Sequence, residues 1–479
     1  MKVLHISRGF RPFIINGLLE YAEDLMDIQV AQGYKVACFF YGRYYPLLRR
    51  PWLRKWWKKD IIMYEIINSP IFRGQGTMYP EADINEEYSE KFFLKVLSEF
   101  QPHIIHIQDL FSLPSSLINI VKLKDIPVLM TLHDYFLLCP TSNLFDYNHS
   151  RCLNQYVGDK CVLCCAQAPR NTNHLIISTL IFEVKKRWLL KTILNNIKRA
   201  RKIKKQIWRC LPNKVLNQER NSSFEKIEKL AEVFQTRRNI NVERLNKIDL
   251  LVAQSSKLAE IYQTLGVQSN KVMTVNSTVK HIDYIKPKSI TSIVGSINFV
   301  TLNGCASVHK GSHLILGAVR KLNEIGLNSQ FKLLVMGHLS EEIKDEILQF
   351  NNVVYKGFYN VTDLDSLLEE MHVGIVPSIW EEAYGYVGIE LLAKGIPVIG
   401  NSLGGIVDYT VDNVTGWLNR ANTADGLAQI MTNIISNPKQ ILELNRSIIS
   451  NYHQIIKSMD GHFKEMDNIY KNLIQTKQK

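Results

Sequence analysis

The sequence contains no apolar run of about 18 residues, the length a membrane-spanning helix requires, so no transmembrane helix is expected. Its longest apolar candidate, Leu175–Phe182, is far too short. The first residues, MKVLHISRG, open directly into a strand pattern and lack the apolar core of a signal peptide. These absences predict a cytoplasmic protein.

The sequence also lacks the motifs of two common ligand classes. No G-x-G-x-x-G follows the first predicted strand, which excludes a dinucleotide-binding fingerprint at that point. No nucleic-acid recognition motif accompanies the net charge of +13, so nucleic acid is not expected as a partner. The excess of 58 Lys and Arg over 45 Asp and Glu nevertheless favours an anionic partner.

The positive charge is concentrated in two segments. Residues 43–59, predicted as a loop, hold seven basic residues and no acid, together with Trp52, Trp56 and Trp57. Residues 183–244 hold eighteen basic residues against six acids. Basic residues mixed with Trp suit an anionic membrane interface, where aromatic rings lie at headgroup depth. The alternative for both segments is a solvated charged face, but the three tryptophans favour peripheral attachment of the first segment to the inner face of a membrane.

Cysteine is sparse outside one cluster. The Cys161-x-x-Cys164 spacing is typical of zinc ligands, and neighbouring cysteines could complete a set of four. The cluster holds five of the eight cysteines, with His149 nearby: Cys139, Cys152, Cys161, Cys164 and Cys165. Three interpretations stay open, namely a structural zinc, reduced and partly buried thiols, and redox chemistry. Disulfides are not expected in a cytosolic chain.

The chain is too long for one core, and two or three domains are expected from its 479 residues. Its first half alternates strand and helix, beginning with a strand over Lys2–Ser7, a helix over Leu18–Gln32 and a strand over Tyr34–Tyr41. An insertion over about 139–245 interrupts this alternation. A polar linker over 280–296 precedes a second alternating set. The pattern predicts an α/β protein with two Rossmann-like doubly wound domains, residues 1–280 and 281–455, facing each other across a cleft. A helix over 456–479 follows and is expected to pack back on the first domain.

Ligands of such sheets bind at the carboxyl ends of the strands, and three loops of the second half meet there. They cover residues 304–310, 378–385 and 401–405, and they carry Lys310 before a helix start, Glu382, and the pair Gly404-Gly405. Glu390 follows a little over a turn into the next helix. A cation and a helix N-terminus together favour a diphosphate, and two carboxylates suit two hydroxyl-bearing parts of one ligand. The alternative is an acid that stabilises a helix N-terminus and a solvated helix residue.

Two further candidates lie in the first half. Asn16-Gly17 opens the first helix and offers free backbone N–H groups to an anion. His133 follows a strand directly, at the edge where ligands bind, although a lone His can equally be a structural residue.

These motifs together resemble family 4 glycosyltransferases of the two-Rossmann (GT-B) class, including bacterial surface-polysaccharide members. The resemblance rests on Glu382-x7-Glu390, Leu391-Leu392-Ala393-x-Gly395-x-Pro397-Val398-Ile399, Gly404-Gly405, Asn16-Gly17, Thr131-Leu132-His133-Asp134-Tyr135 and Lys310-Gly311. It covers roughly residues 1–135 and 250–420.

The resemblance implies a hexosyltransferase-type reaction in which a sugar moves, with retention, from a nucleotide-diphosphate sugar to a polysaccharide or lipid-linked saccharide acceptor. It implies an acceptor-binding first domain and a donor-binding second domain, with no required metal or protein nucleophile. The implied roles are catalytic for His133, Glu382 and Lys310, and donor-binding for Asn16, Gly17, Lys310, Glu382, Tyr384, Gly385 and Glu390. Within these, Glu390 would bind the ribose, Glu382 the sugar hydroxyls and Lys310 the diphosphate.

The sequence departs from the family pattern at two places. Cys305 stands where most members have an Arg before the Lys, and Asn16-Gly17 stands where most have Gly-Gly. Diphosphate stabilisation is therefore expected to depend on Lys310, with help from His309. Three alternatives stay open: a nucleotide-sugar epimerase of the same fold, a phosphorylase, and a non-catalytic GT-B scaffold.

Overall fold

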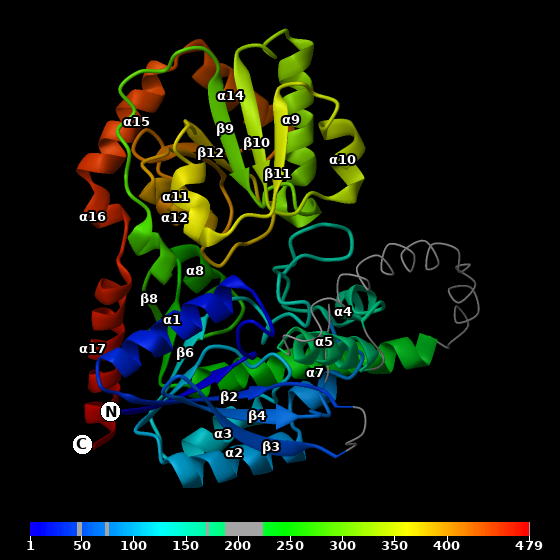
Figure 1. Ribbon diagram of the computed structural model, residues 1–479. Coiled ribbons are helices and arrows are strands. Elements are labelled where there is room, and N and C mark those ends of the chain that lie inside the picture. The colour runs from blue at the N-terminus through cyan, green and yellow to red at the C-terminus, as the bar shows by residue number, and fades with distance from the viewer. Residues whose placement is uncertain (46–49, 72–75, 169–171, 187–223, 479) are drawn as a thin grey trace.

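The computed structural model describes residues 1–45, 50–71, 76–168, 172–186 and 224–478, which form two α/β units stacked one above the other (Figure 1). Each unit is built around one twisted sheet covered by helices. The predicted division near residue 280 falls between the last strand of the first sheet, which ends at Thr274, and the first strand of the second, which begins at Ile297.

The first sheet has eight strands in the order β3-β4-β2-β1-β5-β6-β7-β8. All neighbouring pairs are parallel except β3 with β4, which is antiparallel. The central strands are short apolar runs buried on both faces, as parallel strands flanked by helices must be. The strands are β1 (Lys2–Ser7), β2 (Lys35–Tyr41), β3 (Trp52–Lys58), β4 (Ile61–Ile67), β5 (Ile104–Ile107), β6 (Val128–Leu132), β7 (Leu250–Ala253) and β8 (Val272–Thr274).

Helices cover both faces of this sheet. Leu4 and Ile6 of β1 pack in the same apolar cluster as side chains of α2 and α3, whereas Val3, directly before Leu4, packs against α17 on the opposite face. The helices are α1 (Gly17–Ala31), α2 (Glu87–Phe100), α3 (Ser116–Leu123), α4 (Gly158–Cys164), α5 (Asn173–Lys186), α7 (Phe224–Lys247) and α8 (Ser256–Thr264).

The Trp-rich segment predicted as a loop is an edge strand, so that prediction is wrong. β3 pairs along its whole length with β4, because Trp56 turns inward onto Phe10 and donates its indole N–H to Glu65 at 3.0 Å. Trp57, on the outward side, is 60% exposed. Most lysines of this strand are paired with carboxylates, in the pairs Lys55–Glu99, Lys58–Glu23 and, just beyond it, Lys59–Asp27.

The described part of the second basic segment is the end of α5 and most of the long helix α7, whose arginines are buried. Arg237 is 1% exposed, and it donates to the Asp83 carboxylate at 2.5 Å and to the Phe136 carbonyl at 2.8 Å. Arg244 donates to the Ile84 carbonyl at 2.5 Å. These arginines fit neither a solvated face nor a membrane face, because each of them donates its hydrogen bonds to protein groups instead of to water. Residues 187–223 of the segment lie outside the described residues.

The second sheet has six parallel strands in the order β11-β10-β9-β12-β13-β14. Its strands are β9 (Ile297–Leu302), β10 (Phe331–Met336), β11 (Val353–Gly357), β12 (Val373–Val376), β13 (Val398–Asn401) and β14 (Gly416–Asn419). Its helices are α9 (Ser312–Glu324), α10 (Glu341–Ile347), α11 (Leu364–Leu367), α12 (Tyr386–Ala393), α13 (Ile406–Tyr409), α14 (Ala424–Ser436) and α15 (Lys439–Ser450). The predicted fold class, two Rossmann-like doubly wound domains, is confirmed.

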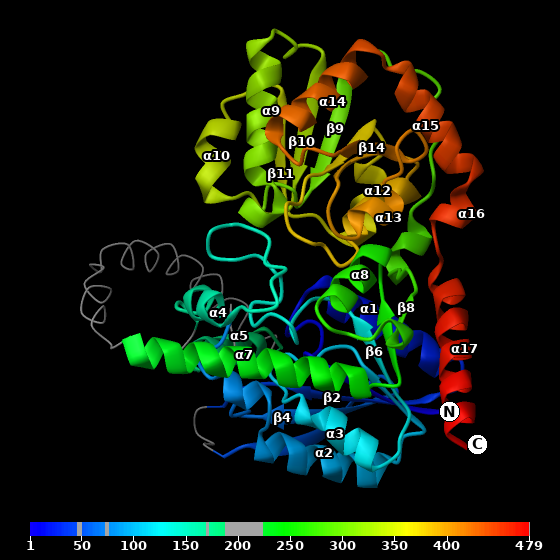
Figure 2. The ribbon, with the colours of Figure 1, turned by 180° about the vertical axis from the view of Figure 1, so that it is seen from behind.

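Two connections join the units. The short 3-10 helix η4 (Lys280–Tyr284) leads from the first sheet to the second, and α16 (Tyr452–Ile455) and α17 (Met459–Gln478) lead back (Figure 2). α17 lies along the first unit, where Met466, Ile469 and Tyr470 join its core. The last helix therefore completes the first domain.

Within the described ranges, no helix is both long enough and apolar enough to cross a membrane.

Candidate functional site

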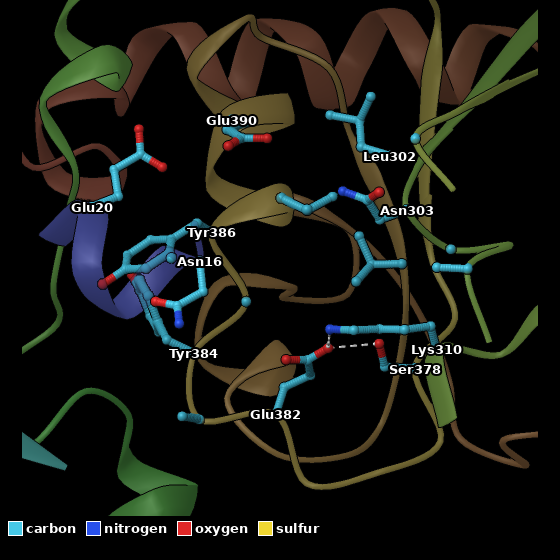
Figure 3. Close-up of a pocket in the computed structure, with 18 of the residues that line it drawn as sticks. Asn16, Glu20, Leu302, Asn303, Lys310, Ser378, Glu382, Tyr384, Tyr386 and Glu390 are labelled. Carbon is cyan, nitrogen blue, oxygen red and sulfur yellow. Dashed lines mark hydrogen bonds and ion pairs between the residues drawn. The ribbon is translucent and has the colours of Figure 1, made fainter. Parts of the chain in front are cut away.

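A cavity of about 600 Å³ lies between the two units and is lined by residues of both. All eight predicted site residues line it: Asn16, Gly17, His133, Lys310, Glu382, Tyr384, Gly385 and Glu390. Figure 3 shows Glu390 and Glu382 at opposite ends of the cavity, with Lys310 reaching toward Glu382. The loops that carry them follow β1, β6, β9 and β12, so the cavity lies at the carboxyl ends of both sheets.

Lys310 and Glu382 form an ion pair at one end of the cavity. Lys310 Nζ lies 2.5 Å from Glu382 Oε1, which also accepts from the Ser378 hydroxyl at 2.8 Å. Burial alone would raise the pKa of Glu382, but the Lys310 charge and these hydrogen bonds outweigh it and lower the pKa. Glu382 is therefore a carboxylate acceptor at neutral pH, and the Lys310 side chain, about a third exposed, is accessible from the cavity.

Glu390, on the first turns of α12, forms the other end. Its Oε1 lies 2.9 Å from His281 Nε2, and His281 Nδ1 lies 3.1 Å from Glu20 Oε1. Burial would lower the pKa of His281, but hydrogen bonds to the two carboxylates outweigh it and raise the pKa to about 10. Glu390 Oε2 is buried and has no hydrogen-bond partner among the residues described. Buried carboxylate oxygens are normally paired, so this atom is a free acceptor for a ligand that fills the cavity.

The loop with Gly404 and Gly405 packs behind the loop that carries Glu381 and Glu382 and holds it in place. The Gly404 amide donates to Glu381 Oε2 at 2.7 Å, and the Gly405 amide donates to the Glu382 carbonyl at 2.7 Å. A Cβ at Gly404 would lie 2.3 Å from the Glu382 nitrogen, so only glycine permits this approach. Neither glycine lines the cavity, so their contribution is to hold Glu382 in place.

Asn16 and Gly17 bring the start of α1 to the cavity wall. The Asn16 side chain caps the helix by accepting from the Leu19 amide at 2.9 Å. A Cβ on Gly17 would touch the Tyr386 ring at 3.4 Å, so the first domain meets α12 of the second closely here. The free N–H groups of the α1 terminus therefore face the same cavity as Lys310.

His133 lies on the first-domain wall, partly exposed to the cavity. Its Nε2 lies 2.8 Å from Gln108 Oε1, and its Nδ1 lies 2.9 Å from the Gln254 amide nitrogen. Burial, with the nearby Arg8 charge, lowers the pKa of His133 to about 3. The ring is therefore neutral at physiological pH.

The predicted help from His309 is not supported by the structure. His309 does not line the cavity, and burial together with the Lys310 charge lowers its pKa, so it carries no positive charge at neutral pH. Cys305, for which the sequence resemblance predicts an Arg, points into the core of the second domain and is fully buried. Its neighbours Asn303, Gly304 and Ala306 line the cavity instead.

The cysteine cluster lies away from the cavity. Three of its members share an apolar cluster with Val157 and Phe234, namely Cys152, Cys161 and Cys165. The described cysteines are free thiols, and no three His, Cys, Asp or Glu side chains of the described chain converge as a metal site requires. A structural zinc stays a prediction, which metal analysis of the purified protein tests.

Sequence reasoning missed several residues that line the cavity: Glu20, Gln254, His281, Asn303, Ser378 and Tyr386. Glu20 and His281 become site residues only because α1 and the interdomain 3-10 helix η4 meet at Glu390. Tyr386 directly follows the predicted Gly385, and its position at a helix start is the one available signal.

Comparison with known proteins agrees with this architecture. Residues 292–454 match the family model described as glycosyl transferases group 1. The chain is 24% identical over 189 residues to the putative colanic acid biosynthesis glycosyltransferase WcaL of Escherichia coli, covering 38% of this chain and 46% of that one. It is 27% identical over 203 residues to the capsular polysaccharide biosynthesis glycosyltransferase CapM of Staphylococcus aureus, covering 41% and 48%. The chain thus spans about half the length of these curated relatives.

Solved structures match over nearly the whole chain. Sucrose-phosphate synthase from Thermosynechococcus elongatus superposes with a TM-score of 0.63 at 14% identity, covering 99% of both chains. HepE of Anabaena, crystallised with UDP and glucose, superposes with a TM-score of 0.58 at 13% identity, covering 98% of this chain and 100% of that one. The two parallel-sheet α/β domains therefore have the GT-B glycosyltransferase fold.

Proposed function

We propose that this protein is a retaining, hexosyltransferase-type family 4 glycosyltransferase that acts in polysaccharide synthesis. It moves a sugar from a nucleotide-diphosphate sugar to a saccharide or lipid-linked saccharide acceptor. One observation carries the proposal: a single interdomain cavity holds Glu390, with a free buried oxygen, at one end and the Lys310–Glu382 pair at the other. A nucleotide sugar has the matching parts, which are ribose hydroxyls, a diphosphate and sugar hydroxyls.

The donor would lie along the cavity with its ribose at Glu390. A carboxylate accepts two hydroxyl hydrogen bonds, and Glu390 Oε2 is available for them. The diphosphate would lie near Lys310 and the N-termini of α1 and α12, where Gly385 has the left-handed φ of 85° that opens α12. The crystal structure of HepE with UDP and glucose supports a uridine donor as the first candidate.

The residues would act by positioning and by stabilising charge. Lys310 would neutralise the charge that builds on the departing diphosphate, and Glu382 would hold hydroxyls of the transferred sugar. His133 would lie beside that sugar from the acceptor side. No metal cofactor is required in this proposal.

The test is a thermal-shift and transfer screen of the full chain against a panel of nucleotide sugars. We expect one uridine, guanosine or adenosine diphosphate sugar to raise the melting temperature and to be consumed when acceptor is present. Glu390→Gln should weaken nucleotide binding about tenfold, because a charge-assisted acceptor is lost. Lys310→Ala and Glu382→Gln should lower kcat/KM at least about 100-fold with the fold retained.

A matched control is Glu346→Gln, which removes a half-exposed carboxylate paired with Arg320 outside the cavity. It should leave binding and transfer unchanged. Full activity of Lys310→Ala or Glu382→Gln contradicts the proposed roles of these residues in the site. Nucleotide binding without transfer to any acceptor favours the non-catalytic scaffold.

We also propose that β3 contacts an anionic membrane surface, which would bring a lipid-linked acceptor to the first domain. The proposal rests on Trp57, 60% exposed, and Trp52, 37% exposed, with Arg54 between them on this edge strand and Arg50 just before it. Flotation with vesicles of anionic phospholipid should recover the wild type and lose Trp57→Ala. Tyr156→Ala, which removes an 84% exposed aromatic elsewhere, should float like the wild type. Equal recovery of the wild type with neutral and anionic vesicles contradicts the proposal.

A further inference from the structure

A buried chain of hydrogen bonds begins behind His133 and runs away from the cavity. The ring is held on both sides by amides, Gln254 at Nδ1 and Gln108 at Nε2. The Gln254 amide nitrogen can only donate, and it also donates to the Tyr386 hydroxyl at 3.1 Å. His133 Nδ1 is therefore an acceptor, and in a neutral ring Nε2 carries the proton and donates to Gln108 Oε1.

The chain continues through a second histidine. With Oε1 accepting, the Gln108 amide nitrogen faces His5 Nδ1 at 3.2 Å and donates to it. His5 Nε2 then carries the proton and donates to Gln29 Oε1 at 2.8 Å. Gln29 in turn donates from its amide nitrogen to the Tyr470 hydroxyl at 3.1 Å. Burial lowers the pKa of His5 to about 4, which agrees with a neutral ring.

Tyr470 closes the chain. Its hydroxyl receives the Gln29 amide, so its one proton goes to the remaining neighbour, His106 Nδ1, at 2.6 Å. His106 Nε2 then donates to the Thr131 hydroxyl at 2.7 Å, on the strand β6 that directly precedes His133. The side chains of the interior part are buried, with Tyr470, His5, His106 and Gln29 all at 0% exposure. With the amides in these orientations, the direction of each bond from His133 to Thr131 follows from that of the bond before it.

Gln108 is the residue at which the directions of these hydrogen bonds can change. Its amide nitrogen lies 3.2 Å from His5 Nδ1 and also 3.2 Å from both ring nitrogens of His106, of which only Nδ1 is unprotonated in the arrangement above. In the native structure the Tyr470 hydroxyl satisfies His106 Nδ1, so the Gln108 amide is left to His5. Without that hydroxyl, the Gln108 amide, which has two N–H donors, can donate to His5 Nδ1, to His106 Nδ1 or to both. The amide then no longer has a single arrangement, and the oxygen that holds His133 is less firmly fixed.

We propose that Tyr470, on the C-terminal helix α17, is a positioning residue for His133, acting through His106, Gln108 and the His5–Gln29 pair. It fixes His133 as the Nε2-protonated neutral tautomer in the cavity wall. This inference rests on the proposed function. A neutral, fixed ring beside the reacting sugar matters because positive charge builds on a sugar ring during glycosyl transfer, and an imidazolium there would oppose it.

The test compares two substitutions that each remove one tyrosine hydroxyl at α17. Tyr470→Phe removes the hydroxyl of the chain, and Tyr34→Phe removes the hydroxyl that bonds Asp467 of α17 without joining the chain. Tyr470→Phe should lower kcat about tenfold or more, with the donor KM unchanged, because the reacting geometry is misplaced while the donor site is intact. Tyr34→Phe should keep the wild-type kcat even if its melting temperature falls as far as that of Tyr470→Phe.

A spectroscopic reading keeps the proposal independent of activity. In full-length protein labelled with ¹⁵N-histidine, the His133 signals, assigned by their loss in His133→Gln, should show a protonated Nε2 and an unprotonated Nδ1. Tyr470→Phe should show both tautomers of His133, and Tyr34→Phe should show the wild-type pattern.

A His133 ring protonated at Nδ1 or doubly protonated in the wild type overturns the proposal, as does a Tyr470→Phe enzyme with unchanged kcat and an unchanged His133 spectrum. If Tyr470→Phe does not fold, the wild-type spectrum alone still decides the tautomer. If the wild type binds no nucleotide sugar, the proposed function fails, whereas the spectrum still tests the positioning of His133.

Discussion

Side chains of the loops around the cavity point either into the cavity or into the protein core, and only those that point into the cavity can contact a ligand. Cys305 stands where the family 4 glycosyltransferases that the sequence resembles usually have an Arg, yet its side chain packs with Phe299 and Ile315 in the core of the second domain. Burial raises the pKa of its thiol to about 12, so it is an uncharged core residue. The cation of this loop is Lys310.

Restoring the usual arginine at this position should therefore harm the protein. Cys305→Arg places an unpaired guanidinium in the core and should reduce the free energy of unfolding by about 3 kcal/mol or more. Cys305→Ala removes only one buried sulfur and should reduce it by about 1 kcal/mol. Thermal melts and transfer assays of both variants check this. A folded Cys305→Arg enzyme with higher activity would show that the loop can turn the residue toward the cavity.

The location of the site is predictable where one loop carries its own signal. Lys310 before a helix, Glu382 and Glu390 at loop and helix, and His133 at a strand end can be identified because strand ends share one edge of a parallel sheet. Residues whose role depends on the other domain cannot be identified in this way. His281 in a linker has no local mark, and its partners, Glu20 and Glu390, are distant in sequence.

At the scale of elements, two segments that the sequence predicts as connections have specific contacts. The sequence of β3 predicts a loop because all of its seven residues except Leu53 are basic or aromatic, without an alternation of polar and apolar residues. The inward turn of Trp56 onto Phe10 is visible only in the fold. The linker contains η4, whose His281 joins a carboxylate of each domain. Such pairing depends on the charge of the imidazole.

The His281 contact should make stability depend on pH. The pKa of His281 is raised from its ordinary value of 6.5 to about 10 in the folded protein, so folding favours the protonated form. The stabilisation is fully present below pH 6.5 and is lost as pH rises toward 10. The melting temperature of the wild type should exceed that of His281→Gln most at about pH 6, and the difference should shrink steadily up to about pH 10. A difference that grows over this range contradicts the assignment.

At the scale of the whole molecule, parts of the first domain extend to the second. The cysteine-rich insertion contacts the loop that carries Glu381 and Glu382 through an ion pair between Arg151 and Glu381. Glu381 is fully buried, whereas Arg151 is 42% exposed, so the arginine covers a carboxylate from the solvent side. The insertion therefore contacts the loop that carries Glu382 without lining the cavity.

Removing this cover should loosen the loop that carries Glu382. Arg151→Ala leaves the Glu381 carboxylate buried, where it still accepts from the Gly404 amide at 2.7 Å but has lost its cation. We expect the free energy of local opening at the Gly404 amide to fall by about 1–3 kcal/mol. Hydrogen exchange followed by mass spectrometry measures it. Arg320→Ala, which breaks a half-exposed pair on the surface, should change exchange at Gly404 by less than about 0.5 kcal/mol. Equal protection of residues 401–405 in Arg151→Ala and wild type excludes the insertion as a support.

The crossing of α17 has a consequence for how the protein is made. A ribosome that has produced every strand of both sheets has not yet supplied Met466, Ile469 and Tyr470, which cover Val3 and Leu129 of the first sheet. Until α17 has been synthesised, one apolar face of the first sheet remains uncovered. His5 and His106, which are buried in the finished protein, remain uncovered with it. The first domain to be synthesised is in this way among the last parts to be finished, and a prematurely ended chain would expose that face to chaperones and proteases.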